Sequence, residues 1–308
     1  MRIAILDTGF ACSTEEQKKK TRSFSDKVKR FESFLENAKP GDGEKDEIGH
    51  GTAVAYQLTR VCPNAELYIG RVGKLVNNEW TADSGAVVRA LEKACDPWGV
   101  DIINMSFGWE DQDDKVHSAL SYAQDKGILL YASVSNFGVL GNNNILYPAR
   151  SPYVIPVDAA DGLGEPASTN SSSESGLIIE RFTAPGVRVK GPIGSERVSG
   201  TSLASPIAAG IAALVLEFAR QPPLGCDKDV TKYLKRKDGM VGIFRLMQNQ
   251  KTSENFKFLC PWYLLSDKKG TYGGNGEPSS RRYYVARRII EDLRREFGPS
   301  IGEKVLLD

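Results

Sequence analysis

Three short segments of the chain carry side chains that together can do nucleophilic chemistry. Asp7 ends the apolar run RIAILD, His50 lies between two glycines in GHGTAVA, and Ser202 lies in SGTSLASPIAAG. A serine hydroxyl is a weak nucleophile that needs a neighbouring base. A histidine held by a carboxylate is such a base. These residue types therefore predict acyl transfer, provided that the fold brings the three segments together.

Each of these residues also has a structural interpretation. An isolated serine at the start of a helix is most often an N-cap, and a single histidine is often structural. The tripeptide Asp-Thr-Gly at residues 7–9 also surrounds the paired carboxylates of aspartic peptidases. We interpret Asp7 instead as the residue that orients His50. The only other histidine, His117, lies in a Lys/Asp-rich helical stretch, and we expect it to be solvated.

The three motifs resemble, in their order, the subtilisin family of serine peptidases: Asp-Thr-Gly, then His-Gly-Thr, then Gly-Thr-Ser-Leu-Ala-Ser-Pro. The resemblance covers about residues 2–220. It implies that Ser202 attacks the scissile carbonyl, that His50 takes and returns the proton, and that Asp7 fixes the His50 tautomer. It further implies that Asn136, in YASVSNFG, holds the oxyanion together with the Ser202 N–H. No cofactor is required.

The resemblance also implies that the substrate is a polypeptide bound in an extended conformation. Strand addition gives affinity through the backbone, and side pockets give preference. Trp80, in VNNEWTADSG (76–85), is expected in an outer apolar pocket. Two segments should enclose the first pocket, with an apolar or small P1 residue as its occupant. The expected walls are Ser106, Phe107 and Gly108 on one side and Ala132, Ser133 and Val134 on the other, and Phe137 and Leu146 should form its floor.

Strand-like and helix-like segments alternate over the first two thirds of the chain. Short apolar strands separated by helices predict an α/β protein, a three-layer α/β/α sandwich with a mostly parallel sheet. The expected strands are 2–7, 65–72, 100–107, 128–135 and 153–160, and the expected helices are 51–62, 81–96, 113–127 and 202–220.

We divide the chain into a core at 1–220 and a C-terminal extension at 221–308, packed on the same domain. The extension is expected to hold a helix or two at 232–248, a strand at 255–265 and an amphipathic helix at 283–298. The charged stretch 18–47 is predicted to be an exposed insertion with one helix.

Composition excludes several classes of partner. The formal charge of +1 gives no reason to expect nucleic acid or an anionic membrane. The longest apolar stretch, 207–219, is too short for a bilayer. The five scattered cysteines, without a CxxC, are expected to be free thiols in a reducing compartment. With two histidines, neither beside a cysteine, we expect no metal site.

Several features depart from the family pattern. Ala53 replaces the second histidine of His-Gly-Thr-His, and few residues separate 51–62 from 65–72, where secreted subtilisins carry a calcium loop. We therefore expect no strong calcium dependence. Without a signal peptide or pro-segment, we expect a cytoplasmic protein or a domain cut from a longer chain. Subtilisin-like domains inside large intracellular proteins, including fungal NLR-type receptors, are the analogy. The alternative function is a catalytically silent peptide-binding or signalling module.

Overall fold

The fold is built on one large sheet. The computed structural model describes residues 1–12, 14–76, 79–136, 145–171, 179–192, 196–249, 256–265 and 278–305. Its main sheet has the strand order β12-β9-β8-β7-β6-β1-β3-β2, and all neighbouring strands in it run parallel. The strands are β1 (Arg2–Asp7), β2 (Val28–Ser33), β3 (Glu66–Arg71), β6 (Ile102–Met105), β7 (Leu129–Ser133), β8 (Val154–Ala160), β9 (Phe182–Pro185) and β12 (Lys257–Phe258).

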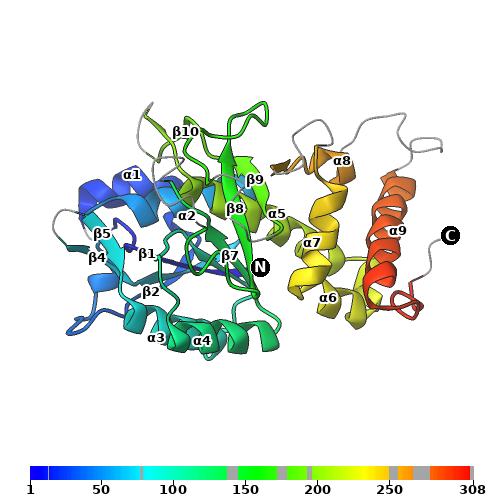
Figure 1. Cartoon of the computed structure of the whole chain (residues 1–308), viewed down its shortest axis with the longest axis horizontal. Coiled ribbons are helices and arrows are strands. Elements are labelled where there is room, and N and C mark those ends of the chain that lie inside the picture. Colours follow the sequence, from blue (N-terminus) through cyan, green and yellow to red (C-terminus); the bar gives the residue numbers. More distant parts are fainter. Residues whose placement is uncertain are drawn as a thin grey trace.

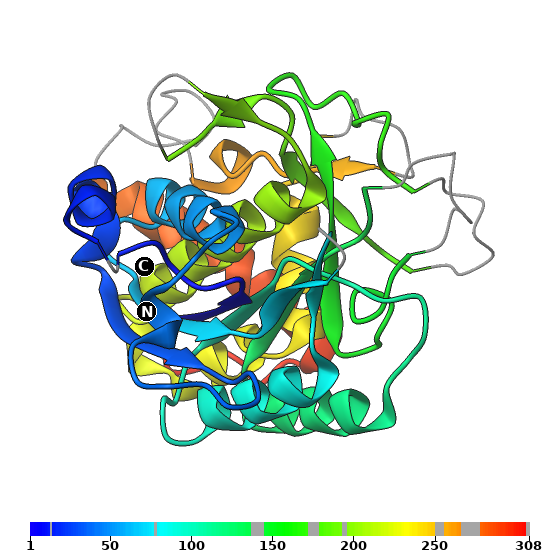
Figure 2. The ribbon, with the colours of Figure 1, turned by 90° about the vertical axis from the view of Figure 1, so that its left-hand side faces the viewer.

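Helices cover both faces of this sheet, as a parallel sheet requires. Helices α2 (His50–Val61) and α5 (Thr201–Ala219) pack on one face, and α3 (Ser84–Cys95) and α4 (Asp114–Asp125) pack on the other (Figures 1 and 2). The alternating side chains of each central strand divide between the two cores. Ile3 and Ile5 of β1 join the α2/α5 side, for example, whereas Ala4 and Leu6 join the α3/α4 side. The predicted three-layer α/β/α sandwich is confirmed.

The sheet has a topological switch point beside β1. After β1 the chain forms the edge strand β2 and returns to β3 beside β1, and it then crosses to the other side of β1 and continues outward through β6, β7, β8 and β9. Ligands in open α/β sheets bind outside the carboxyl ends of the strands at such a point. Asp7 is the last residue of β1, and Asn104 and Ser106 lie at and just beyond the end of β6. The topology therefore places the predicted site residues where a parallel sheet offers a crevice.

Helix α5 is long and apolar enough to cross a bilayer by length and composition, but 83% of its apolar window is buried inside the protein. It touches α2, β6, β7, β8 and β9, so it is the central helix of the α2/α5 core. The expectation of a buried central helix is thereby met, although the helix begins six residues before the apolar run 207–219.

The insertion at 18–47 differs from its prediction. It contains α1 (Glu15–Ser25), the 3-10 turn η1 (Asp42–Glu44) and also β2, which pairs in parallel with β3 and forms one edge of the sheet. The charged sequence VKRFES hid this strand, because an edge strand packed on one side tolerates polar residues. A second missed element is the antiparallel hairpin of β4 (Gly73–Val76) and β5 (Glu79–Ala82), which precedes α3.

The extension beyond Arg220 contributes one strand and several helices. The helices are η3 (Leu224–Cys226), α6 (Lys228–Leu234), α7 (Lys237–Leu246), α8 (Trp262–Leu265) and α9 (Pro278–Phe297). Before α5, outside this extension, β10 (Val189–Lys190) and β11 (Arg197–Val198) form a small hairpin. Apolar residues of α6, α7 and α9 join the same core as α5 (Figure 1). The strand predicted over 255–265 is only β12, because the following residues turn into α8.

Candidate active site

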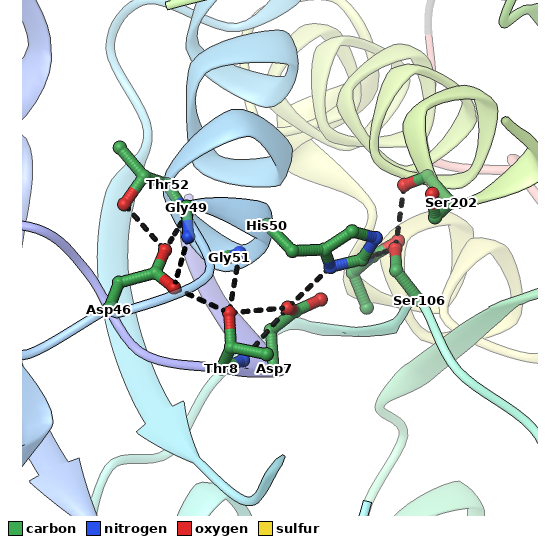
Figure 3. Close-up of polar contacts among 10 residues, drawn as sticks. Asp7, Thr8, Asp46, Gly49, His50, Gly51, Thr52, Ser106 and Ser202 are labelled. Carbon is green, nitrogen blue, oxygen red and sulfur yellow. Dashed lines mark hydrogen bonds and ion pairs between the residues drawn. The ribbon is translucent and has the colours of Figure 1, made fainter. Parts of the chain in front are cut away.

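The His50 imidazole is held by Asp7. His50 opens α2, and its Nδ1 lies 2.7 Å from Oδ1 of Asp7, whose side chain is fully buried. An ionised carboxylate can only accept, so Nδ1 carries the proton and Nε2 is left as an acceptor. The ring is 21% exposed. The arrangement prepares His50 to take a proton on the side that faces away from Asp7 (Figure 3).

A second carboxylate, Asp46, lies behind the same helix end. It accepts from the N–H of Gly49 and the hydroxyl of Thr8 on one oxygen, and from the N–H and hydroxyl of Thr52 on the other, all at 2.7–2.8 Å. The Thr8 hydroxyl in turn accepts from the N–H of Gly51 at 2.9 Å. Asp46, Thr8 and Thr52 were not among the predicted site residues.

The two positions that flank His50 require glycine for different structural reasons. Gly49 has φ +81° with open space around it, so it serves the left-handed backbone before α2. At Gly51 a Cβ would stand 2.3 Å from the carbonyl oxygen of Gly9. Gly51 therefore allows α2 to lie directly on the loop after β1.

Ser202 lies in the first turn of α5, and its carbonyl is held from outside the helix. Pro206 lies in the second turn of this helix. Proline has no N–H, so the Ser202 carbonyl four residues earlier receives no helical hydrogen bond. The Ser106 hydroxyl donates to it instead at 2.8 Å. Asn104 contacts the Ser106 hydroxyl at 2.9 Å and also accepts from Ser205. This network anchors the turn that carries Ser202 to β6.

Asn136 is oriented by the residue before the serine. Its Oδ1 accepts from both the N–H and the hydroxyl of Thr201, at 2.8 and 3.0 Å. The amide nitrogen is thereby turned to the other side, where it can donate. A Cβ built on Gly200 would stand 3.1 Å from Ser202 Oγ and 3.5 Å from Asn136 Nδ2. Gly200 therefore keeps open the space between the hydroxyl and the amide, which is where an oxyanion would form.

His50, Asn136 and Ser202 line one cavity of about 170 Å³. Among the described residues, no hydrogen bond joins the His50 ring to the Ser202 hydroxyl. Catalytic hydrogen bonds are often long in the absence of substrate and tighten when it binds.

Burial and charge act in opposite directions on His50. Burial lowers the pKa of the imidazole, whereas the charge and hydrogen bond of Asp7, with a further contribution from the charge of Asp46, raise it. The net result is a pKa above the ordinary value of 6.5. The two carboxylates therefore favour the imidazolium that forms when His50 accepts a proton.

Comparison with known proteins supplies the family. The model of the subtilase family, Peptidase S8, matches residues 1–238. The chain belongs to the subtilase family. It is 33% identical to the subtilisin-like protease het-Q2 of Podospora anserina, over 74% of this chain and 72% of that one. It is likewise 33% identical to subtilisin DY of Bacillus licheniformis, over 70% and 76%. The prenylagaramide maturation protease PagA shares the fold, with a TM-score of 0.65 at 23% identity over 85% and 92% of the two chains.

The cavity of this subtilase contains most, but not all, of the predicted pocket residues. It is lined by His50, Trp80, Thr81, Ala82, Ser106, Phe107, Gly108, Ser133, Ser135, Asn136, Leu146, Thr201 and Ser202. Ala132 and Val134 do not line it. Their side chains are buried in the α3/α4 core, because successive residues of a strand point to opposite faces and Ser133 alone of the three turns to the cavity. Phe137 lies outside the described residues, as do Asn77 and Asn78 of the predicted opposite wall.

Trp80 lies nearer to the chemistry than the outer pocket that we expected. Its ring packs on the His50 ring, with centroids 5.0 Å apart, and meets the Phe107 ring edge-on at 6.3 Å. Gly73 on the paired strand makes this possible, since a Cβ there would stand 2.7 Å from the indole. In this subtilase the β4–β5 hairpin therefore places the Trp80 indole directly against the His50 imidazole.

Two further details bear on the sequence interpretation. The chain has a second tripeptide of the aspartic-peptidase type, Asp83-Ser84-Gly85. The Asp83 carboxylate caps α3 by accepting from the Ala86 N–H at 2.8 Å, so it is not paired with Asp7. His117 is half-buried rather than solvated, and its ring packs on Tyr153.

The described part of this subtilase holds no group of three or more His, Cys, Asp or Glu side chains that could bind a metal ion. All five cysteines are free, and four of them are buried. Four residues, 62–65, join α2 to β3.

Proposed function

We propose that this chain is a serine endopeptidase that hydrolyses polypeptides through an acyl-enzyme formed on Ser202. Nε2 of His50 accepts the hydroxyl proton as Ser202 Oγ attacks the scissile carbonyl. The same nitrogen then returns the proton to the leaving amine. Asp7 holds the tautomer and stabilises the imidazolium. The observation that carries this proposal is the 2.7 Å contact of Asp7 with a histidine that opens into the same cavity as Ser202.

The oxyanion has two proposed donors. The Asn136 amide is turned toward the cavity because Thr201 occupies its oxygen. The Ser202 N–H lies in the first turn of α5, where backbone donors have no helical partner and the helix dipole favours negative charge. Both would strengthen their contacts as charge develops on the substrate oxygen, which is the condition for lowering the barrier.

A fluorophosphonate probe tests the proposal directly, because it reacts only with a serine that an adjacent base activates. The wild-type chain should be labelled, and Ser202→Ala should not. Ser118→Ala is a matched control, since Ser118 lies on α4 outside the cavity and its exposed hydroxyl donates to the Asp114 carbonyl. It should keep its label. A folded wild-type chain that resists the probe at every pH from 6 to 9 would favour the silent peptide-binding module.

We further propose that the P1 residue is small and apolar. Ser106, Phe107 and Gly108 on one side and Ser133 on the other leave a narrow opening, and among the described residues that line the cavity His50 is the only one with a titratable side chain. Leu146 closes the pocket against Gly108, where a Cβ would stand 2.6 Å from that of Leu146. A charged P1 side chain would thus lose its hydration without gaining a partner.

Leu146→Gly checks this preference. The variant should turn over substrates with a large P1 residue such as Phe better than the wild type does, by about 10–200-fold in kcat/KM. Substrates with Ala at P1 should change little. A peptide-library profile dominated by Arg or Lys at P1 in the wild type would contradict the proposal.

A further inference from the structure

Asp46 is the most densely hydrogen-bonded side chain at the site, yet it lies outside the triad. It is 5% exposed and accepts four hydrogen bonds: two from the backbone at the N-terminus of α2 and two from threonine hydroxyls. All four partners act as donors, so Asp46 acts as an ionised carboxylate does. A buried charge satisfied in this way holds its neighbours firmly in place.

The partners of Asp46 belong to two different elements. Gly49 and Thr52 belong to the start of α2, whereas Thr8 follows directly after the β1 strand that carries Asp7. The Thr8 hydroxyl has one proton and two candidate acceptors, Asp46 Oδ1 at 2.8 Å and Asp7 Oδ1 at 3.3 Å. The shorter contact takes the proton. Thr8 can then bridge Asp46 to the Gly51 N–H, and Asp7 keeps its oxygen for His50 and the Thr8 N–H (Figure 3).

A second set of hydrogen bonds joins the loop after β1 to α2. The Thr52 hydroxyl, which donates to Asp46, also accepts from the N–H of Ala11 at 2.9 Å. The loop after β1 is therefore tied to α2 at two points, by the bond of Thr8 with Gly51 and by the bond of Ala11 with Thr52, and both threonine hydroxyls in these bonds donate to Asp46. Gly51 allows the close approach that these bonds need, since its Cα lies directly against Gly9.

We propose that Asp46 is a positioning residue that locks the start of α2 onto the loop after β1, and so fixes the His50 ring against Asp7. This inference rests on the proposed function for its effect on turnover, but its effect on the His50 ring can be measured without any turnover.

A second consequence is electrostatic. The charged groups that act on His50 are Asp7, from the end of β1, and Asp46, from the loop before α2. The groups that face the ring from the other elements, Trp80 on β5 and Ser202 on α5, are uncharged. Removing the charge of Asp46 should therefore make the imidazolium less favourable.

The chain offers a direct reading of this effect, because it has only two histidines. Nuclear magnetic resonance can follow the titration of both imidazoles in the Ser202→Ala background, with His117 on α4 as the internal reference. Asp46→Asn should move the His50 midpoint to lower pH and leave His117 in place. Glu47→Gln is the matched control: this neighbouring carboxylate is 62% exposed and pairs with Arg71. It should move the His50 midpoint less, because exposed charges are screened.

A pair of neutral substitutions tests the link without changing any charge. In the otherwise wild-type chain, Thr8→Val removes the bridge to Asp46 and Gly51, and Thr8→Ser keeps a hydroxyl there. Thr8→Val should lower kcat by up to about 10²-fold with KM little changed, as a displaced catalytic group does. Thr8→Ser should restore most of the rate.

The outcomes separate the two proposals. An unchanged His50 midpoint in folded Asp46→Asn, together with an unchanged kcat in Thr8→Val, would overturn the positioning role. If Asp46→Asn does not fold, the Thr8 pair decides alone. A shifted His50 midpoint in a chain whose wild type resists the fluorophosphonate probe would support the positioning role while refuting the proposed peptidase activity.

Discussion

The two helices that meet at the site begin in opposite ways. At the start of α2, the N–H groups of Gly49, Gly51 and Thr52 are all taken by Asp46 or Thr8. At the start of α5, Gly200 offers no side-chain cap, and the Thr201 N–H is bound by Asn136. Among the described residues, the Ser202 N–H has no acceptor. We call the start of α2 the closed helix end, because oxygen atoms of the protein bind these N–H groups. We call the start of α5 the open helix end, because the Ser202 N–H remains available to a ligand.

The difference corresponds to what each helix has to do. A base must be held in one orientation before the reaction starts, so a helix end with bound N–H groups on both sides of the base and a carboxylate behind it suits His50. An oxyanion exists only during the reaction, so its donors must be ready but unsatisfied beforehand. Both helix ends use the backbone N–H groups that have no partner within the helix. The difference is whether an oxygen atom of the protein already accepts a hydrogen bond from them.

The largest expected effect concerns the open helix end. Asn136→Ala should lower kcat by about 10²–10³-fold with little change in KM, the loss known for such a donor in a subtilisin. The substitution removes a bond that forms only in the transition state. Steady-state kinetics on a peptide substrate measures both constants, with the exposed Asn64→Ala as control. A rise in KM at constant kcat would show instead that Asn136 binds the ground state.

Substitutions at the closed helix end, the start of α2, should change mainly the stability of the fold. At Gly51 an added methyl group would meet the Gly9 carbonyl, so Gly51→Ala should destabilise the fold by about 3 kcal/mol and also reduce kcat. Gly49→Ala meets nothing and carries only the left-handed backbone cost of about 1 kcal/mol. Chemical denaturation of the two variants gives the comparison. Equal losses would mean that α2 does not lie as close to the loop after β1 as described.

The pH dependence should reflect the carboxylates at the closed end. His50 must be neutral to accept the serine proton, and its pKa lies above 6.5 because Asp7 and Asp46 outweigh the effect of burial. The value of kcat/KM should therefore fall as pH falls, with a midpoint above 6.5. A profile between pH 5 and 9 at constant ionic strength locates that midpoint. A midpoint clearly below 6.5 would mean that burial dominates.

The smallest expected effect is that of calcium. Only residues 62–65 connect α2 to β3, which leaves no room for a metal-binding loop there. Thermal melts with and without calcium should therefore nearly coincide, with magnesium as the control. A site present at a thousand times its Kd would add about 4 kcal/mol, or about 8–16 °C in Tm, and such an increase would refute the prediction.

The sequence was sufficient to predict the fold and to propose the site residues that lie within contiguous motifs. Asp7, His50 and Ser202 could be proposed because each lies in a short local pattern, and the parallel sheet could be predicted from the alternation of apolar strands and helices. Asn136 followed from the same resemblance. The structure brings all four to the carboxyl edge of the sheet or to helix ends beside it.

What the sequence did not reveal depends on partners far apart in the chain. Asp46 and Thr8 are 38 residues apart, and nothing in either segment alone indicates that they share a hydrogen bond. An Asp four residues before His50 was a detectable signal, because carboxylates favour helix starts. The edge strand β2 was missed because its charged residues resemble a solvated loop. Of residues 132–134 only Ser133 faces the cavity, because alternate residues of a strand point to opposite faces and the contiguous segment does not show which face is which.

Pro206 has a consequence for how precisely a substrate can be aligned. Because it cannot donate to the Ser202 carbonyl, α5 borrows that bond from Ser106, next to the segment proposed to carry the bound peptide. A helix whose backbone hydrogen bonds are all internal can slide or rotate slightly on its neighbours, but α5 is fixed to Ser106 at the turn that carries Ser202. The proposed attacking atom, Ser202 Oγ, and the proposed peptide-binding segment are therefore held by the same hydrogen bond. Small movements of the sheet should carry both together and leave their alignment intact.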